Sequence, residues 1–244
     1  MQIKKHIPNF FTMLNIICGF IAIIFACQEN FLLTFYFIIA ASFFDFVDGG
    51  VARLLHVQSE IGKQLDSLCD VVSFGVAPGI ILFYIMKDSL ALNSDIIISK
   101  LSCLQILLLL SMAAVPAFSA LRLAKFNIDT RQTDSFIGVP VPASALLISS
   151  LGAMYNIYNI AWLNNLLNQP IILLVISLCI SYLLISPLPL FALKFKNFKW
   201  KDNKIRFIFI ATALLSVFLF KIGGIVLSII FYILFSLITR LTNK

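Results

Sequence analysis

The sequence predicts an all-α protein, a polytopic bundle of about eight transmembrane helices. Two observations carry this prediction. Of the 244 residues, 61% are hydrophobic and 12% are charged, whereas a soluble domain is about half apolar and about a quarter charged. The apolar residues also gather in runs of roughly twenty, the length that a helix needs to cross the hydrocarbon core. This composition excludes a water-soluble globule, a disordered chain, a coiled coil and a disulfide-rich secreted scaffold.

The predicted spans follow one another with short connections. The second and third carry carboxylates at one end, the fifth has Pro140 and Pro142 where a helix would begin, and the last two hold no specific motif. The spans are residues 10–27, 31–52, 66–86, 102–122, 137–160, 170–191, 205–220 and 223–239. We expect residues 1–244 to form a single integral-membrane domain, with the helices at about 205–239 accessory to the rest.

The basic residues indicate how the spans are oriented. With the N-terminus in the cytoplasm, eight spans alternate and return the C-terminus to the same side. Fifteen of the 18 Lys and Arg residues, the cluster at 194–206 among them, then face the cytoplasm, and the other side holds Lys87, Lys100 and Lys221. This distribution follows the positive-inside rule for a cytoplasmic (inner) membrane. The net charge of +7 reflects topology and attraction to anionic lipids, and we expect no nucleic-acid partner.

Four of the eleven acidic residues lie within or at the ends of the second and third spans. Asp45 and Asp48 are three residues apart on one helix, and Asp66 and Asp70 are four residues apart on the next. Each pair therefore shares one helical face. The connection near residues 54–61 is short, so we expect the two helices to be antiparallel neighbours that bring all four carboxylates together.

Carboxylates inside or beside a bilayer are costly and mark functional sites. Four of them at close range repel one another unless a cation is bound. With no His or Cys among them, these oxygen ligands favour Mg²⁺ or Mn²⁺ over Zn²⁺. The alternative, in which the four residues cap helices or pair with Arg53 and Lys63, explains one Asp better than it explains four.

The surroundings of the carboxylates suit a phosphate-bearing ligand. Gly49, Ala52 and Gly62 allow a close approach to the backbone, and the guanidinium of Arg53 can bind a phosphate. Carboxylate-bound metal beside an arginine, open to the cytoplasm, points to phosphoryl transfer on a membrane-bound substrate. A divalent-cation transporter is the alternative from another class, although such proteins often have repeated halves with a site near the midplane, and no second acidic cluster follows in the later half.

The spacing of these residues resembles the signature of the CDP-alcohol phosphatidyltransferases. Residues 45–70 read D-x2-D-G-x2-A-R-x8-G-x3-D-x3-D, with all eight fixed positions in place. The resemblance implies an integral-membrane helical fold whose active site faces the cytoplasm. It also implies that Asp45, Asp48, Asp66 and Asp70 hold two divalent metal ions, that Asp70 is the catalytic base, and that Gly49, Ala52, Arg53 and Gly62 bind the CDP group.

Further blocks look like the bacterial and archaeal members of this family that use serine as the acceptor. They are Ile7–Asn9 with Thr12, Asn15 and Gly19, then Asp66–Pro78, Arg122–Asn127 and Phe136–Ala143, and together they cover roughly the first 145 residues. The resemblance implies a single catalytic domain that takes CDP-diacylglycerol from the membrane lipids and L-serine from the cytoplasm, releasing phosphatidylserine and CMP. Dimers are common in the family, so a homodimer is an expectation of the same kind.

The acceptor site is the less specific part of this interpretation. A zwitterionic acceptor needs a cation for its carboxylate, and Arg122 or Lys125 could serve that role or bind a lipid phosphate. Ser67, Ser73 and Asn127 are the candidate polar contacts. Glycerol 3-phosphate and inositol phosphate remain alternative acceptors, since the choice of serine depends on the resemblance alone.

Overall fold

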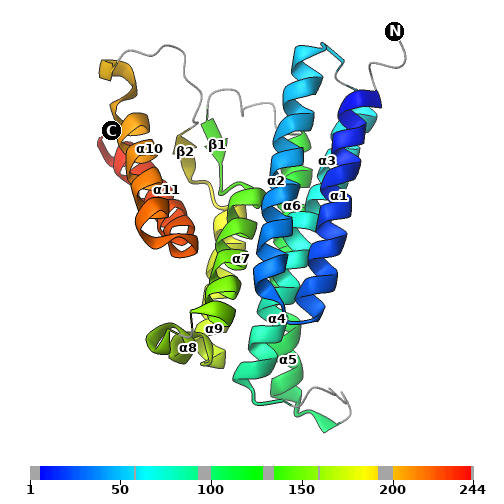
Figure 1. Ribbon diagram of the computed structural model, residues 1–244, viewed down its shortest axis with the longest axis vertical. Helices are drawn as coiled ribbons and strands as arrows, with labels where there is room; N and C mark the ends of the chain where they lie inside the picture. Colours follow the sequence, from blue (N-terminus) through cyan, green and yellow to red (C-terminus); the bar gives the residue numbers. More distant parts are fainter. Residues whose placement is uncertain are drawn as a thin grey trace.

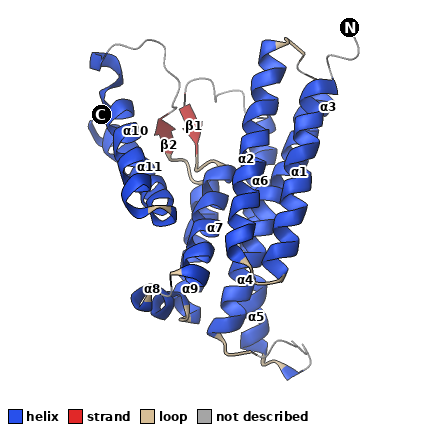
Figure 2. Cartoon of the chain, viewed as in Figure 1, coloured by secondary structure: helices blue, strands red, loops and turns tan. Residues whose placement is uncertain are grey.

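The computed structural model describes residues 6–57, 59–92, 100–128, 135–158, 160–191 and 200–242. Helices make up nearly all of this part of the chain, and one short two-stranded sheet lies beside them (Figures 1 and 2). The elements are α1 (His6–Cys27), α2 (Phe31–Leu54), α3 (Glu60–Asp70), the π-helical segment η2 (Val71–Val76), α4 (Ala77–Ser89), α5 (Cys103–Ser111), α6 (Ala114–Ile128), β1 (Ser135–Ile137), α7 (Val141–Ile157), α8 (Ala161–Leu167), α9 (Pro170–Ile185), β2 (Pro189–Phe191), α10 (Trp200–Phe220) and α11 (Ile222–Thr242).

The helices confirm a multi-pass membrane protein. Among the described residues, six helical segments are long and apolar enough to cross a membrane, and α8 with α9, bent by 81°, forms a seventh candidate. The remaining predicted span corresponds to α7, which is apolar but has 17 residues. Each of the eight predicted runs therefore coincides with helix, while six or seven of them meet the length required of a span.

The boundaries of the fifth and sixth predicted spans differ from the helices found. Residues 135–137 pair antiparallel with residues 189–191, with Phe136 opposite Leu190. Helix α7 starts after Pro140, and α9 ends before Pro187, which lacks the N–H that a continuing helix needs. The hydropathy of these segments does not distinguish helix from a short strand, so both predicted spans extend beyond their helices.

Helix α1 is the centre of the N-terminal half. It packs against α2, α3, η2 and α4, and α2 and α3 each contact α1 more than they contact one another. Helices α2 and α3 therefore meet through side chains near their carboxylate-bearing ends rather than along their length. Their polar ends still meet at the end of the bundle where α1 begins (Figure 1).

The interior of the bundle is apolar, and so is much of its outer surface. Phe31, Phe74 and Ile81 are fully buried, whereas Phe46 and Phe218 are more than 70% exposed. In a membrane the outer side chains face hydrocarbon, so their exposure is the expected state of a lipid-facing surface. The polar residues that remain inside are therefore informative, and most of those discussed below lie near one end of α1.

Candidate active site

Three carboxylates from two helices meet at that end of the bundle. Asp45 and Asp48 come from α2 and Asp66 from α3, and one oxygen from each lies within 4.8 Å of the others. Asp48 is buried, and the other two are half-buried. One oxygen of Asp66 is buried without a hydrogen-bond partner.

This donor set fits a divalent cation. Three carboxylate oxygens at this spacing can converge on one ion, and an all-oxygen set is typical of Mg²⁺ and Mn²⁺ sites. Three carboxylates so close together can all be ionised only when a cation compensates their charge. Asp70 stands outside this group of three, although it interacts electrostatically with Asp45 and Asp66.

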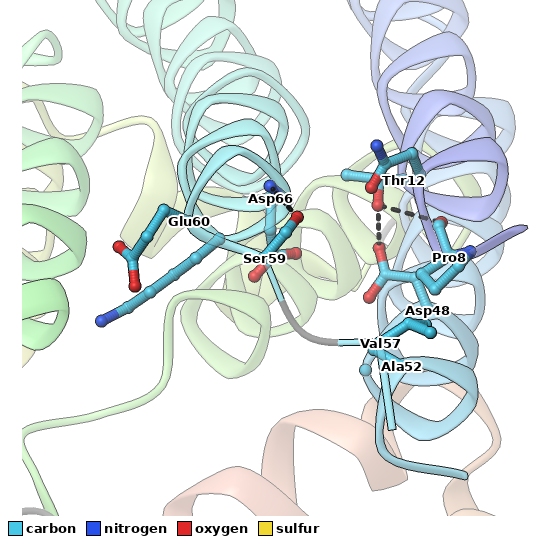
Figure 3. Close-up of a pocket in the computed structure, with 12 residues that line it drawn as sticks. Pro8, Thr12, Asp48, Ala52, Val57, Ser59, Glu60 and Asp66 are labelled. Atoms are coloured by element: carbon cyan, nitrogen blue, oxygen red, sulfur yellow. Dashed lines mark hydrogen bonds between the residues drawn. The ribbon is translucent and has the colours of Figure 1, made fainter. Parts of the chain in front are cut away.

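Helix α1 holds two of the carboxylates in place. The hydroxyl of Thr12 donates a 2.7 Å hydrogen bond to Asp48 (Figure 3), and the side-chain amide of Asn15 donates a 3.0 Å bond to Asp70. Asn15 is fixed in turn, because its backbone carbonyl accepts a 3.1 Å bond from Ser73 of η2. Asp48 and Asp70 are thus oriented by neutral donors rather than by basic residues.

A close contact between α1 and η2 supports this arrangement. A Cβ atom added to Gly19 would lie 2.8 Å from the Cα of Ser73, so only glycine fits there. The π-helical segment begins directly after Asp70, and such segments often mark functional sites. The hydroxyl of Ser73, a predicted substrate contact, is bonded to the Asn15 carbonyl of α1 in this structure.

A cavity of about 600 Å³ opens beside the carboxylates (Figure 3). Its walls come from the first turns of α1, the end of α2 and the start of α3, and Asp48 and Asp66 line it. Its other lining residues are Pro8, Asn9, Thr12, Gly49, Ala52, Val57, Ser59, Glu60, Gly62 and Lys63. Gly62 lies in the first turn of α3, one turn before Asp66, and its backbone N–H donates a 3.0 Å hydrogen bond to the hydroxyl of Ser59.

The sequence around this site matches a known protein family. The family model of the CDP-alcohol phosphatidyltransferases matches residues 5–183, which is most of the chain and includes the carboxylates, the cavity and α1. The chain belongs to the CDP-alcohol phosphatidyltransferase family. These enzymes transfer a group from a CDP-alcohol donor to an alcohol acceptor and use a divalent metal.

Curated relatives support this assignment. A CDP-diacylglycerol–serine O-phosphatidyltransferase of Bacillus subtilis is 34% identical over 195 residues, which is 80% of this chain and 92% of that protein. One from Methanocaldococcus jannaschii is 40% identical over 70% of this chain and 71% of its own length. One from Helicobacter pylori is 38% identical over 58% of this chain, and the match spans 54% of that protein.

Three of the four predicted nucleotide contacts are small residues. Gly49, Ala52 and Gly62 all line the cavity. Arg53 is exposed and not part of the lining, and its Nε donates a 2.9 Å bond to the carbonyl of Gly49, one turn earlier. The structure thus brings three of the four predicted nucleotide contacts together, and Arg53 follows Ala52 along α2 outside the lining.

The predicted acceptor residues separate into two groups. Arg122 is 8% exposed and has an electrostatic attraction to Asp70, whereas Lys125 on the same helix is exposed. Asn127 donates a 2.8 Å bond to Ser67, and its carbonyl accepts a 2.7 Å bond from Lys63. Ser67 and Asn127 therefore join α3 to α6, and Arg122 is the basic residue among the candidates that lies inside the bundle.

Sequence reasoning did not assign roles to Thr12, Asn15 and Lys63. The first two had a detectable signal, since Thr12, Asn15 and Gly19 are spaced by three and four residues and so share one face of an otherwise apolar helix. Lys63 carried no comparable signal, because a basic residue next to a loop is explained by membrane topology alone.

Proposed function

We propose that this protein transfers the phosphatidyl group of CDP-diacylglycerol to the hydroxyl of L-serine, giving phosphatidylserine and CMP. The observation that carries the proposal is the carboxylate group beside a polar cavity lined by the family's signature residues. The names of the relatives favour serine as the acceptor. Because the chain spans about half the length of the Helicobacter relative, the activity of the whole protein is proposed and not inferred from that name.

The carboxylates would hold the metal that the family requires. In our proposal Asp45, Asp48 and Asp66 bind the cation, with Asp70 completing a site for two Mg²⁺ or Mn²⁺ ions. A bound divalent cation would neutralise the pyrophosphate and stabilise the negative charge that develops on the departing CMP. Thr12 keeps Asp48 turned toward this group through its hydrogen bond.

Asp70 is the proposed general base. The serine hydroxyl attacks the phosphorus that carries the diacylglycerol, its proton passes to the Asp70 carboxylate, and the bond from phosphorus to the CMP oxygen breaks. The hydrogen bond from Asn15 occupies one carboxylate oxygen of Asp70, so the second oxygen is the one that would take the proton. Direct attack gives inversion at phosphorus and no covalent enzyme intermediate.

The cavity would bind the CDP group. Gly49, Ala52 and Gly62 leave room for the nucleotide along its walls, and Arg53, next to Ala52 in the sequence, would contact the phosphates. Its Nε is engaged with Gly49, so the terminal guanidinium nitrogens are the donors for phosphate. The acyl chains stay in the lipid beside the apolar outer surface.

We further propose that the protein lies in the cytoplasmic membrane as one catalytic domain, with both termini and the active site in the cytoplasm. The beginning of α1 and the end of α11 lie toward the same end of the bundle, as this orientation needs (Figure 1). Residues 192–199, part of the predicted basic cluster, lie outside the described residues. Helices α10 and α11 are proposed to be accessory, and a homodimer stays a prediction from the family.

The test is release of CMP from CDP-diacylglycerol by the purified full chain in detergent. Mn²⁺ or Mg²⁺ is supplied, and serine, glycerol 3-phosphate, inositol phosphate or water is offered separately. Serine alone should stimulate release and yield phosphatidylserine. Stimulation by another alcohol would support the same chemistry with a different acceptor. If no acceptor supports metal-dependent release of CMP, the proposed activity is refuted.

A further inference from the structure

Helices α6 and α9 enclose polar atoms that lack partners. The two helices pack directly on one another. Four buried atoms on them form no hydrogen bond within the described part of the chain, namely the hydroxyl oxygens of Ser119, Ser177 and Ser181 and the Nε of Arg122. The three serines are 1% exposed or less, and Arg122 is 8% exposed. Buried polar atoms without partners are costly, so a group of them requires a water molecule, an ion or a ligand that satisfies them.

The serine hydroxyls are unusual for buried serines in helices. Such a hydroxyl commonly bonds to a carbonyl of the preceding turn, as Ser149 of α7 does with Leu146. Ser177 and Ser181 are four residues apart and therefore share one face of α9, and Ser119 and Arg122, three apart, share one face of α6. Each helix thus contributes a short polar strip to an apolar interior.

Helix α6 packs against η2, the segment that directly follows Asp70. Arg122 interacts electrostatically with Asp70, the proposed base, and with Tyr232 of α11. Its guanidinium carbon lies 5.9 Å from the centre of the Phe126 ring, which covers one side of the charge. Ser119 is close to Gly75 of η2, the segment that follows Asp70, since a Cβ on Gly75 would be 3.2 Å from that of Ser119.

We infer that Arg122, Ser119, Ser177 and Ser181 form the compartment that binds the amino-acid part of the acceptor. The inference rests on the proposed function and adds the three serines to it. The acceptor carboxylate pairs with the guanidinium of Arg122, and the serine hydroxyls donate to that carboxylate or accept from the ammonium group. The acceptor hydroxyl is then held on the side of Asp70.

The charge of this compartment explains the choice of acceptor. Among the described residues, Arg122 and Lys87 are the buried cations, and Lys87 forms an ion pair with Glu29. A single cation matches one carboxylate, whereas a phosphate monoester carries nearly two negative charges and needs further basic groups. The compartment therefore selects a carboxylate-bearing acceptor over glycerol 3-phosphate or inositol phosphate.

The first test measures steady-state kinetics of Ser119→Ala and Ser181→Ala in the full chain. Loss of one buried hydrogen bond should raise KM for serine about fivefold or more, with KM for CDP-diacylglycerol unchanged. Ser149→Ala is the matched control, because Ser149 is equally buried and its hydroxyl is bonded within its own helix. An unchanged KM for serine in both variants, with the wild type active on serine, would overturn the inference and leave the proposed function intact.

The second test compares L-serine with serinol, in which a hydroxymethyl group replaces the carboxylate. The wild type should turn over serine much faster than serinol. Arg122→Gln should lose most of this preference, because serine turnover falls while serinol turnover stays unchanged. A general loss of packing would reduce both reactions equally, and that result would contradict the assignment of Arg122. A wild type inactive on serine would instead refute the proposed function.

Discussion

Asp70 differs from the three clustered carboxylates in what holds it. It accepts a hydrogen bond from the amide of Asn15, while Asp45, Asp48 and Asp66 have oxygens within 4.8 Å of one another. In the proposed mechanism Asp70 accepts a proton in addition to completing the metal site, whereas the other three carboxylates serve the cation alone. The environment of each residue decides its task.

Replacement of Asp70 by Asn should separate these tasks. The variant retains the shape of the side chain but removes the base, so CMP release should fall by about 10²–10⁴-fold while Mn²⁺ remains bound. Turnover is measured as CMP release, and metal binding is measured by the electron paramagnetic resonance signal of Mn²⁺. Near-normal turnover in this variant would assign the base to another group.

The clustered carboxylates should account for the metal requirement. A chelator should abolish CMP release, and added Mg²⁺ or Mn²⁺ should restore it. Asp66→Asn should raise the metal concentration needed for half-maximal activity, because one charged ligand is lost. Asp88→Asn is the control, since Asp88 lies at the opposite end of the same helical span. An equal shift in both variants would argue against a specific site.

At the scale of elements, α1 is the part that assembles the site. It contacts both carboxylate-bearing helices and supplies Thr12 and Asn15. The close approach of Gly19 to Ser73 allows the backbone carbonyl of Asn15 to accept its bond from η2. The geometry of Asp70 thus depends on a packing contact about one helical turn away along α1.

Gly19→Ala should disturb this contact. The added methyl would overlap Ser73, and overpacking of this kind costs about 1–3 kcal/mol, so the thermal midpoint in detergent should fall by several degrees and activity should fall with it. In Gly50→Ala the new Cβ meets no atom within 4 Å, so its midpoint should stay near that of the wild type. Equal midpoints for the two variants would show that α1 and η2 have room to move apart.

For the whole molecule, orientation follows from the distribution of charge. A fluorescent protein that folds only in the cytoplasm, fused to the C-terminus, should be fluorescent, whereas a periplasm-dependent phosphatase at the same place should be inactive. The opposite pair of results would place the active site on the outer side. It would also reverse the proposed route of serine to Arg122.

The sequence predicted the architecture well where helical periodicity and hydropathy are strong signals. All eight apolar runs coincide with helix, and the signature spacing placed Asp45, Asp48 and Asp66 in one group. It predicted less well where two conformations have the same hydropathy, as at Ile137 and Pro189, which are paired strand residues inside predicted spans.

What the sequence determined by itself is the class of protein, the family and the carboxylates, because composition and residue spacing within one helix are local properties. Tertiary structure decided that α2 and α3 both pack against α1, that Thr12 and Asn15 orient the carboxylates, and that Arg122 is buried while Lys125 is exposed. Periodicity shows which residues share a helical face. Which helices those faces meet depends on packing between segments distant along the chain, and in this protein that packing forms the candidate active site.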